Sequence, residues 1–340
     1  MRALRIVPVV LVIAGLAGCD MIMGSAGPEI CNDAQALLRS GDLAGAEAAY
    51  EALAADGKSQ LCVVTGRSYM KTLSGNYGAA DKILAEAEPN AGEELGNIKL
   101  RRALVGLEEG NLDAVREHGI ASGLPAGKVL AAEVHLTDLE SDKAVALLKE
   151  ASSAGGQVGQ TASRYLEMLE AGGAQAGMAE VTALWALNRR ADAVETVVEL
   201  VGMLPEDENK SAQLLIWASR AVTSGKPDVA RELLDSIDFP PEGQGWRVQA
   251  IRAMADVADG DGAAGLETFK KLAAGGAPAD GLADAMATAA CLTEDKAIAK
   301  ELVGEQESYA GARCLSAVGA GGVAKRVVPA GTLKTFLESR

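Results

Sequence analysis

The chain has 340 residues, of which 49% are hydrophobic, 3% aromatic and 23% charged, and its formal net charge is −15. A chain this apolar is not a disordered polymer, and one with so few aromatic residues is atypical of a β-sandwich. The negative charge argues against nucleic acid as a partner, because the phosphate backbone would repel an acidic surface.

The N-terminal segment has the pattern of a secretory signal. Arg2 and Arg5 precede an apolar stretch, residues 6–16. This stretch is shorter than the about 20 residues of a membrane-spanning helix. Leu16-Ala17-Gly18-Cys19 follows and resembles the signal of bacterial lipoproteins. The resemblance implies that residues 1–18 are removed and that Cys19 is acylated, so that the chain is held on a lipid membrane. The alternatives are an ordinary signal peptide and an uncleaved anchor.

Residues 19–28 are expected to carry the lipid anchor and a short tether. The stretch 20–28 spans at most about 30 Å, so the folded part would lie close to the membrane. We therefore expect a protein of the bacterial cell envelope that faces the periplasm. Asp20 resembles the inner-membrane retention signal of enteric bacteria, a rule that does not extend to all bacteria, so the choice between inner and outer membrane stays open.

Four cysteines remain after Cys19, in two local pairs near opposite ends of the chain. They are Cys31 with Cys62, and Cys291 with Cys314. Because the periplasm permits disulfides, the spacing predicts one disulfide in each pair. Buried free thiols are the alternative, and the absence of a CxxC motif or a nearby histidine argues against a metal site.

Short polar turns with a glycine recur along the body of the chain. Gly41, Gly75 and Gly110 are separated by 34 and 35 residues, and Gly225 and Gly260 by 35. Small residues before and after each turn would let two helices approach closely, while larger apolar residues further on fill the space toward the next pair. The small residues are Ala34, Ser68, Ala103, Ala132, Ala218 and Ala253 before the turns, and Ala46, Ala80, Ala144, Ala193 and Ala230 after them.

This pattern resembles the tetratricopeptide repeat (TPR) family, whose unit is two antiparallel helices in 34 residues. The resemblance implies an all-α fold, a right-handed α-solenoid of about eight degenerate helix-turn-helix repeats over residues 29–303. A generic α-solenoid is the alternative, because the aromatic residue at the fourth position of the unit is mostly absent.

Two further segments depart from the repeat. Ala144 and Ala193 are 49 residues apart, which predicts an extra helix near residues 160–170, between two Gly-Gly pairs. Residues 304–340 are expected to form a C-terminal capping region, with a short helix at 330–339, because the ends of a solenoid need a polar cap. No segment alternates with period two, so we expect no strands.

The sequence offers little for catalysis. Its two histidines, His118 and His135, lie outside any zinc motif, and we expect them to be packing or surface residues. Residues 122–128 lack the magnesium-binding hydroxyl of a phosphate-binding loop, and residues 256–267 lack inner ligands of a calcium loop. We therefore expect no enzyme, no cofactor and no metal.

The TPR resemblance implies a partner-binding groove lined by the first helices of the repeats. Trp185 and Met254 suit such a groove because aromatic and thioether groups are adaptable contacts. The alternative is that these side chains fill gaps between neighbouring helices. Counting back from the turns places six residues in the groove: Met178, Trp185, Leu215, Ser219, Arg247 and Met254.

The resulting hypothesis is a lipid-anchored, periplasm-facing TPR scaffold that binds another envelope protein in its groove. Bacterial TPR lipoproteins serve in outer-membrane protein assembly, in recruitment of cell-wall enzymes and in pilus or secretion assembly, and these residues do not choose among such roles. The alternatives are a small-ligand or glycan-binding lipoprotein and a self-assembling structural protein of the envelope.

Overall fold

The structure is a computed structural model that describes residues 29–40, 42–58, 60–204 and 208–303. Within these ranges every regular element is a helix, which confirms the all-α prediction for this part of the chain. The predicted signal (1–18), tether (19–28) and cap (304–340) lie outside the described residues. The 3-10 helices are η1 (Glu29–Cys31), η2 (Glu88–Asn90) and η3 (Gly92–Glu94). The α-helices are α2 (Asn32–Ser40), α3 (Leu43–Ala55), α4 (Leu61–Leu73), α5 (Tyr77–Ala87), α6 (Leu95–Glu109), α7 (Leu112–Ala121), α8 (Pro125–Thr137), α9 (Ser141–Ser152), α10 (Gly156–Ala171), α11 (Gly173–Ala186), α12 (Arg190–Val201), α13 (Glu208–Thr223), α14 (Pro227–Asp235), α15 (Gly245–Ala258), α16 (Gly262–Ala274), α17 (Ala279–Leu292) and α18 (Lys296–Val303).

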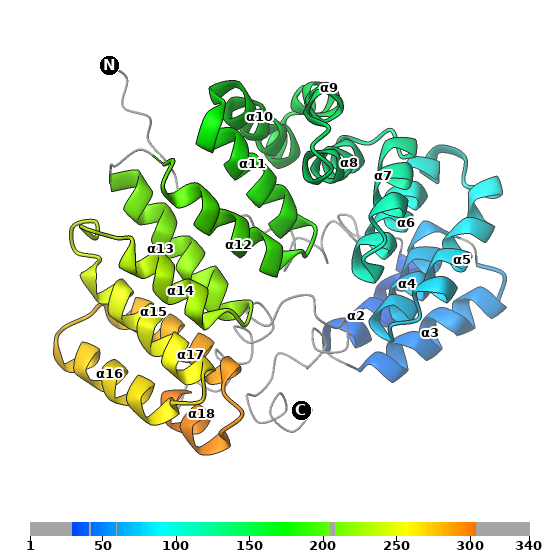
Figure 1. The fold of residues 1–340 in the computed structure, drawn as a ribbon. Coiled ribbons are helices and arrows are strands. Elements are labelled where there is room, and N and C mark those ends of the chain that lie inside the picture. The colour runs from blue at the N-terminus through cyan, green and yellow to red at the C-terminus, as the bar shows by residue number, and fades with distance from the viewer. Residues whose placement is uncertain (1–28, 41, 59, 205–207, 304–340) are drawn as a thin grey trace.

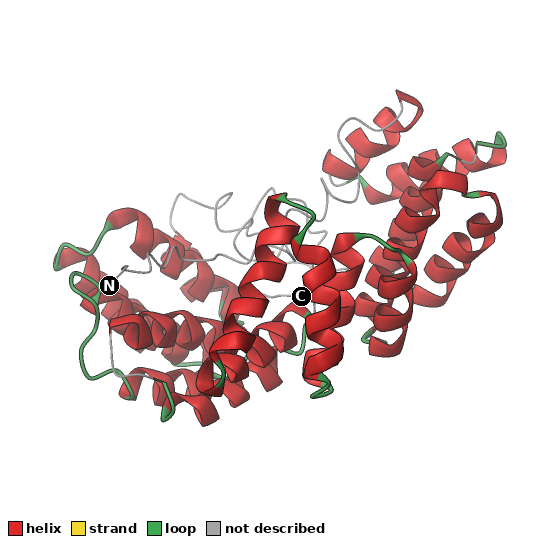
Figure 2. Cartoon of the chain, turned by 90° about the horizontal axis from the view of Figure 1, so that it is seen from above, coloured by secondary structure: helices red, strands yellow, loops and turns green. Residues whose placement is uncertain are grey.

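Consecutive helices pack as hairpins, and each hairpin packs on the next. The pairs are α2/α3, α4/α5, α6/α7, α8/α9, α11/α12, α13/α14, α15/α16 and α17/α18. Figure 1 shows these hairpins following one another along an open arc from α2 to α18. Seen from above, in Figure 2, the described array consists of helices joined by short loops.

The same hydrogen-bonded turn closes six of the described hairpins. Between α4 and α5, the amide of Gly75 donates to the carbonyl of Thr72, and the amide of Asn76 donates to the carbonyl of Lys71. This pattern requires a left-handed residue, which glycine adopts without strain. The side chain of Asn76 then caps α5 by accepting from the amide of Ala79. The left-handed residues of the six turns are Gly75, Gly110, Leu139, Asn188, Gly225 and Gly260.

One helix stands outside the hairpin pattern. Helix α10 lies between the α8/α9 and α11/α12 hairpins, packing on α9, α8 and α11, so the predicted extra helix is confirmed. It begins after Gly155 and ends before Gly172, whose φ angles of +69° and +68° mark these glycines as the points where the chain leaves helical geometry.

The small residues predicted to flank the turns are buried in the array. All eleven are at most 3% exposed, as the prediction of close helix approach requires. Larger residues beyond them are also buried, among them Tyr50, Leu84, Leu148 and Val197. Small-residue spacing thus correctly predicted which side of each helix faces the array.

The buried apolar side chains are distributed unevenly. From α11 to α18 they form one continuous cluster that includes Leu214, Leu233 and Phe269. Between η1 and α11 they fall into four smaller clusters, centred for example on Tyr50, Leu84 and Tyr165.

Ion pairs link the second helix of one hairpin to the first helix of the next. Asp81, Arg116 and Arg231 stand six residues after the turn residues Gly75, Gly110 and Gly225, and Glu47 lies 34 residues before Asp81. Each reaches an opposite charge on the next hairpin, and each such partly exposed pair is worth at most about 1 kcal/mol. The pairs are Glu47–Lys71 (2.7 Å), Asp81–Arg102 (2.6 Å), Arg116–Asp138 (2.7 Å) and Arg231–Asp256 (3.0 Å).

A disulfide fastens the first hairpin to the second. The sulfur atoms of Cys31, at the end of η1, and Cys62, in α4, are 2.07 Å apart, which confirms the predicted N-terminal pair. Cys291 is fully buried in α17. Its predicted partner, Cys314, lies outside the described residues, so this second pairing stays a prediction.

Candidate functional site

The six predicted groove residues do not share one exposed surface. Met178, Leu215 and Met254 are buried in the large core cluster, at 7%, 0% and 3% exposure. Burial removes these three from the surface that a partner can touch, and they fill space between neighbouring helices, as the alternative interpretation expected. Counting back from the turns placed them on the packing side of α11, α13 and α15.

The other three predicted residues remain accessible. Trp185, Ser219 and Arg247 are half-buried on α11, α13 and α15. The guanidinium of Arg247 donates to the side-chain oxygen of Gln244 at 2.8 Å. Only Trp185 takes part in a larger constellation of side chains.

That constellation, which we call the Trp–Arg cluster, consists of Trp185, Arg190, Trp217 and Arg220. The rings of Trp185 and Trp217 meet edge to face, with centroids 5.7 Å apart and planes at 87°. The guanidinium carbon of Arg220 lies 4.7 Å from the centroid of Trp185 and 4.4 Å from that of Trp217. Arg190 lies 4.9 Å from the ring of Trp185. These distances are those of cation–π contacts, which hold a guanidinium in a fixed place.

Helix ends bring the Trp–Arg cluster together. Trp185 is in the last turn of α11, and Arg190 begins α12 after the turn at Asn188. Trp217 and Arg220 stand three residues apart on α13 and therefore lie on one face of that helix. The cluster thus belongs to the interface between two adjacent hairpins.

The cluster contains two arginine side chains, Arg190 and Arg220. Burial, and to a lesser extent the nearby charge of Arg190, lowers the pKa of Arg220 to about 10. The guanidinium of Arg220 is still protonated at neutral pH. Among the residues that the structure describes, no carboxylate lies within ion-pair distance of it. The charge of Arg190 lies close enough to that of Arg220 to affect its pKa, in a chain whose net charge is −15.

Sequence reasoning singled out Trp185 but missed both arginines of the cluster. The signal for Arg220 is its spacing of three from Trp217, and the signal for Arg190 is its place just across a turn from Trp185. Neither signal stands out in the sequence. The count from the turns chose Leu215 and Ser219 as the exposed face of α13, whereas the residues that meet Trp185 are one or two positions further along the helix.

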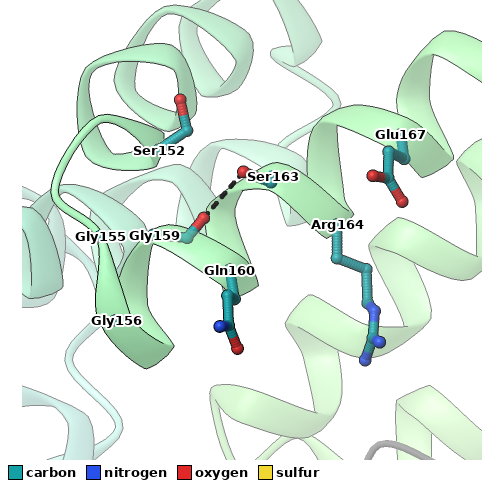
Figure 3. A pocket seen from close by; sticks show the side chains of 8 residues that line it. All are labelled: Ser152, Gly155, Gly156, Gly159, Gln160, Ser163, Arg164 and Glu167. Carbon is teal, nitrogen blue, oxygen red and sulfur yellow. Dashed lines mark hydrogen bonds between the residues drawn. The ribbon is translucent and has the colours of Figure 1, made fainter. Parts of the chain in front are cut away.

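A shallow hollow lies on α10, away from the Trp–Arg cluster. It has a volume of about 490 Å³ and is bordered by the α9–α10 turn. Figure 3 shows Gln160 and Arg164 along its helix and the hydroxyl of Ser163 donating to the carbonyl of Gly159, a bond of 2.9 Å. Its lining residues are Ser152, Gly155, Gly156, Gly159, Gln160, Ser163, Arg164 and Glu167. An open polar hollow of this kind suits water or a weakly held polar molecule.

One buried carboxyl lies between α8 and α10. The hydroxyl of Tyr165 donates to Glu133 Oε1 at 3.0 Å, and both side chains are almost completely buried. Burial raises the pKa of Glu133 to about 8, against the opposing effect of the hydrogen bond from Tyr165. Glu133 is therefore mostly protonated at neutral pH and acts as a structural group.

The two histidines lie apart, on α7 and α8. His118 is buried, and burial together with the charge of Arg102 lowers its pKa. His135 Nδ1 is 2.6 Å from a carboxylate oxygen of Glu140. Over the residues that the structure describes, no group of three or more His, Cys, Asp or Glu could hold a metal ion. No described helix is both long and apolar enough to cross a membrane.

Comparisons with known proteins leave the family open. No protein-family model matches the chain, and no curated protein matches it significantly. What the protein does is therefore inferred from its residues and their geometry.

Proposed function

We propose that this protein is a membrane-anchored, periplasm-facing scaffold, a TPR-like α-solenoid that binds another protein of the cell envelope. The observation that carries the proposal is the array of consecutive hairpins closed by one shared turn. Each hairpin of such an array contacts only its neighbours, so the array presents a long surface for its length of chain. Surfaces of this kind suit capture of a partner by shape.

The N-terminal sequence supplies the second part of the proposal. Acylation of Cys19 would hold the scaffold at the membrane, since each buried CH₂ of an acyl chain contributes about 0.8 kcal/mol. Confinement to the membrane raises the local concentration of any partner that is anchored there too. An acidic body would not bind anionic lipid by charge, so the acyl chains would provide the attachment.

The Cys31–Cys62 disulfide is consistent with an oxidising compartment such as the periplasm. It also limits motion at the hairpin nearest the anchor, because it connects η1 to α4. The part of the scaffold nearest the membrane would then be covalently restrained.

Crosslinked pull-down from native membranes tests this function. Wild-type protein and a Cys19→Ala variant would be recovered after crosslinking, and bound proteins identified by mass spectrometry. We expect a reproducible envelope partner that is captured with the anchored form and lost with Cys19→Ala. Recovery of the protein alone from the wild-type sample would contradict the scaffold function.

The hollow on α10 is the observation that bears on a small-ligand function. Its lining contains Arg164, Gln160 and Glu167 but no aromatic ring, although sugar rings commonly stack on aromatic side chains. We therefore rank a glycan or small-ligand receptor second. A ligand that raises the melting temperature with concentration, and no longer does so in Arg164→Ala, would favour this second function.

A further inference from the structure

Arg220 differs from the arginines that stabilise the hairpin joints. Arg102, Arg116 and Arg231 each contact carboxylates on a neighbouring element. Arg220 instead contacts two indole rings, at 4.7 and 4.4 Å. Within the described part of the chain it has no ion pair, although the protein as a whole is acidic.

The indole contacts leave hydrogen-bonding capacity unused. A guanidinium carries five N–H donors in its own plane, and a ring that packs against its face satisfies none of them. Packing against Trp185 and Trp217 also restricts the side chain, so less conformational entropy is lost when a ligand binds. Arg220 is therefore a preorganised donor, and no carboxylate of the described residues lies opposite it.

The surroundings of Arg220 increase its attraction for an anion. Partial withdrawal from water strengthens a charge-assisted hydrogen bond, and the neighbouring charge of Arg190 adds to the positive potential. A carboxylate placed there would make two parallel N–H···O bonds with one guanidinium.

We propose that the Trp–Arg cluster is a receptor for a carboxylate on an acidic segment of a partner protein, with Arg220 as the main contact. The inference rests on the proposed scaffold function, which makes the partner a protein, and carboxylates are the oxyanions that unmodified proteins carry. Trp185 and Trp217 position Arg220, and the half-buried Trp185 adds apolar contact to residues next to the carboxylate.

Peptide titration of the full-length chain, in a non-ionic detergent, tests the receptor. The probe is acetyl-Ala-Glu-Ala-Glu-Ala-amide, the matched peptide carries glutamine in place of glutamate, and inorganic phosphate is a third titrant. Binding is followed by tryptophan fluorescence in a Trp246→Phe background, because Trp185 and Trp217 then give the signal. We expect saturable binding of the glutamate peptide, and binding at least about tenfold weaker for the glutamine peptide.

Variants identify the contact. Arg220→Gln is expected to weaken binding of the glutamate peptide at least about tenfold, and Arg220→Lys to weaken it less, because a charge remains without the fork of two donors. The matched control is Arg252→Gln, on α15, whose arginine pairs with Asp235. It should bind as the wild type does. Melting temperatures show whether each variant is folded.

Three results would overturn the receptor. One is no saturable response of the wild-type chain to the glutamate peptide, a result that does not depend on any variant. Another is equal binding by Arg220→Gln in a folded state. The third is binding of phosphate alone, which would make the cluster a site for free phosphate instead of a protein segment.

Pull-down with Arg220→Gln separates this inference from the scaffold function. If the variant captures the same envelope partner as the wild type, the carboxylate receptor is wrong and the scaffold stands. If the wild type captures no partner but the peptide still binds through Arg220, the scaffold fails and the carboxylate site remains.

Discussion

The two halves of the array are held together in different ways. From α11 to α18 a single apolar cluster runs through every described hairpin. From α2 to α9 the core is divided into small clusters, and a disulfide joins the first two hairpins, while ion pairs bridge joints in both halves. In a repeat array, cooperativity depends on the contacts between neighbours. The difference teaches that the C-terminal half should unfold as one unit, while hairpins of the N-terminal half open more independently.

The largest expected effect comes from truncating a buried side chain in the continuous apolar cluster of α11–α18. Phe269→Ala, at a fully buried position of α16, should lower the free energy of unfolding by about 3–5 kcal/mol. Hydrogen exchange followed by mass spectrometry should then show lost protection across α11–α18. The matched change, Leu84→Ala in a small N-terminal cluster, should reduce protection only in α4–α6. Loss confined to α15 and α16 in Phe269→Ala would contradict the single unit.

Removal of the disulfide should weaken one end only. The double variant Cys31→Ala, Cys62→Ala frees a loop with a sequence separation of 31 residues. In the chain-entropy model this costs about 3 kcal/mol. We expect faster exchange in α2–α5 and unchanged exchange in α13–α18. A shift of the C-terminal protection as well would show that the two halves are coupled more strongly than their cores indicate.

The buried carboxyl near the boundary of the two halves should make stability depend on pH. Because the pKa of Glu133 rises from 4.5 to about 8 on folding, the folded chain holds this proton more tightly than the unfolded chain. Its contribution to stability is therefore fully present below pH 4.5 and is lost as the pH rises toward 8. Glu133→Gln should remove this slope and stabilise the protein at pH 7 by on the order of 2 kcal/mol. Urea unfolding between pH 5 and 8 measures the free energy of unfolding of each protein, with the exposed Glu167→Gln as the control. If Glu133→Gln and the wild type show the same dependence of stability on pH, Glu133 does not cause the slope.

The smallest expected effect compares one turn from each half. Leu139 is 77% exposed and has a φ of +60°, so its strain is not offset by burial. Leu139→Gly should raise the free energy of unfolding by roughly 1 kcal/mol, and Gly225→Ala, where nothing crowds the added Cβ, should lower it by a similar amount. Denaturant midpoints measure both. A stabilising Gly225→Ala would mean that the shared turn is not maintained in solution.

Local patterns made most of the fold predictable. Turn glycines such as Gly75, and small residues such as Ala80, act within one hairpin, so their spacing reports directly on the helices they join. Leu139 was harder to see, because a leucine gives no turn signal even where the backbone is left-handed.

The candidate site was predicted less well because it depends on which way each helix face turns. An error of one or two residues rotates a position by 100–200° around an α-helix of 3.6 residues per turn. The expected residues, Leu215 and Ser219, differ from the observed residues, Trp217 and Arg220, by two positions and one position in the sequence. Contacts between hairpins decide the rotation, and a single sequence does not reveal those contacts.

The charges at the hairpin joints also specify the order of the hairpins. At the first two joints the acid comes first, from Glu47 and Asp81, whereas at the next joint the base comes first, from Arg116. A hairpin exchanged with another, within one chain or between two copies, would leave Asp81 or Arg116 without the opposite charge that its own neighbour supplies. Loss of these opposite-charge pairs disfavours the pairing of similar hairpins out of sequence. The weak ion pairs thus distinguish the correct neighbour from the wrong one, a task for which their sign matters more than their strength.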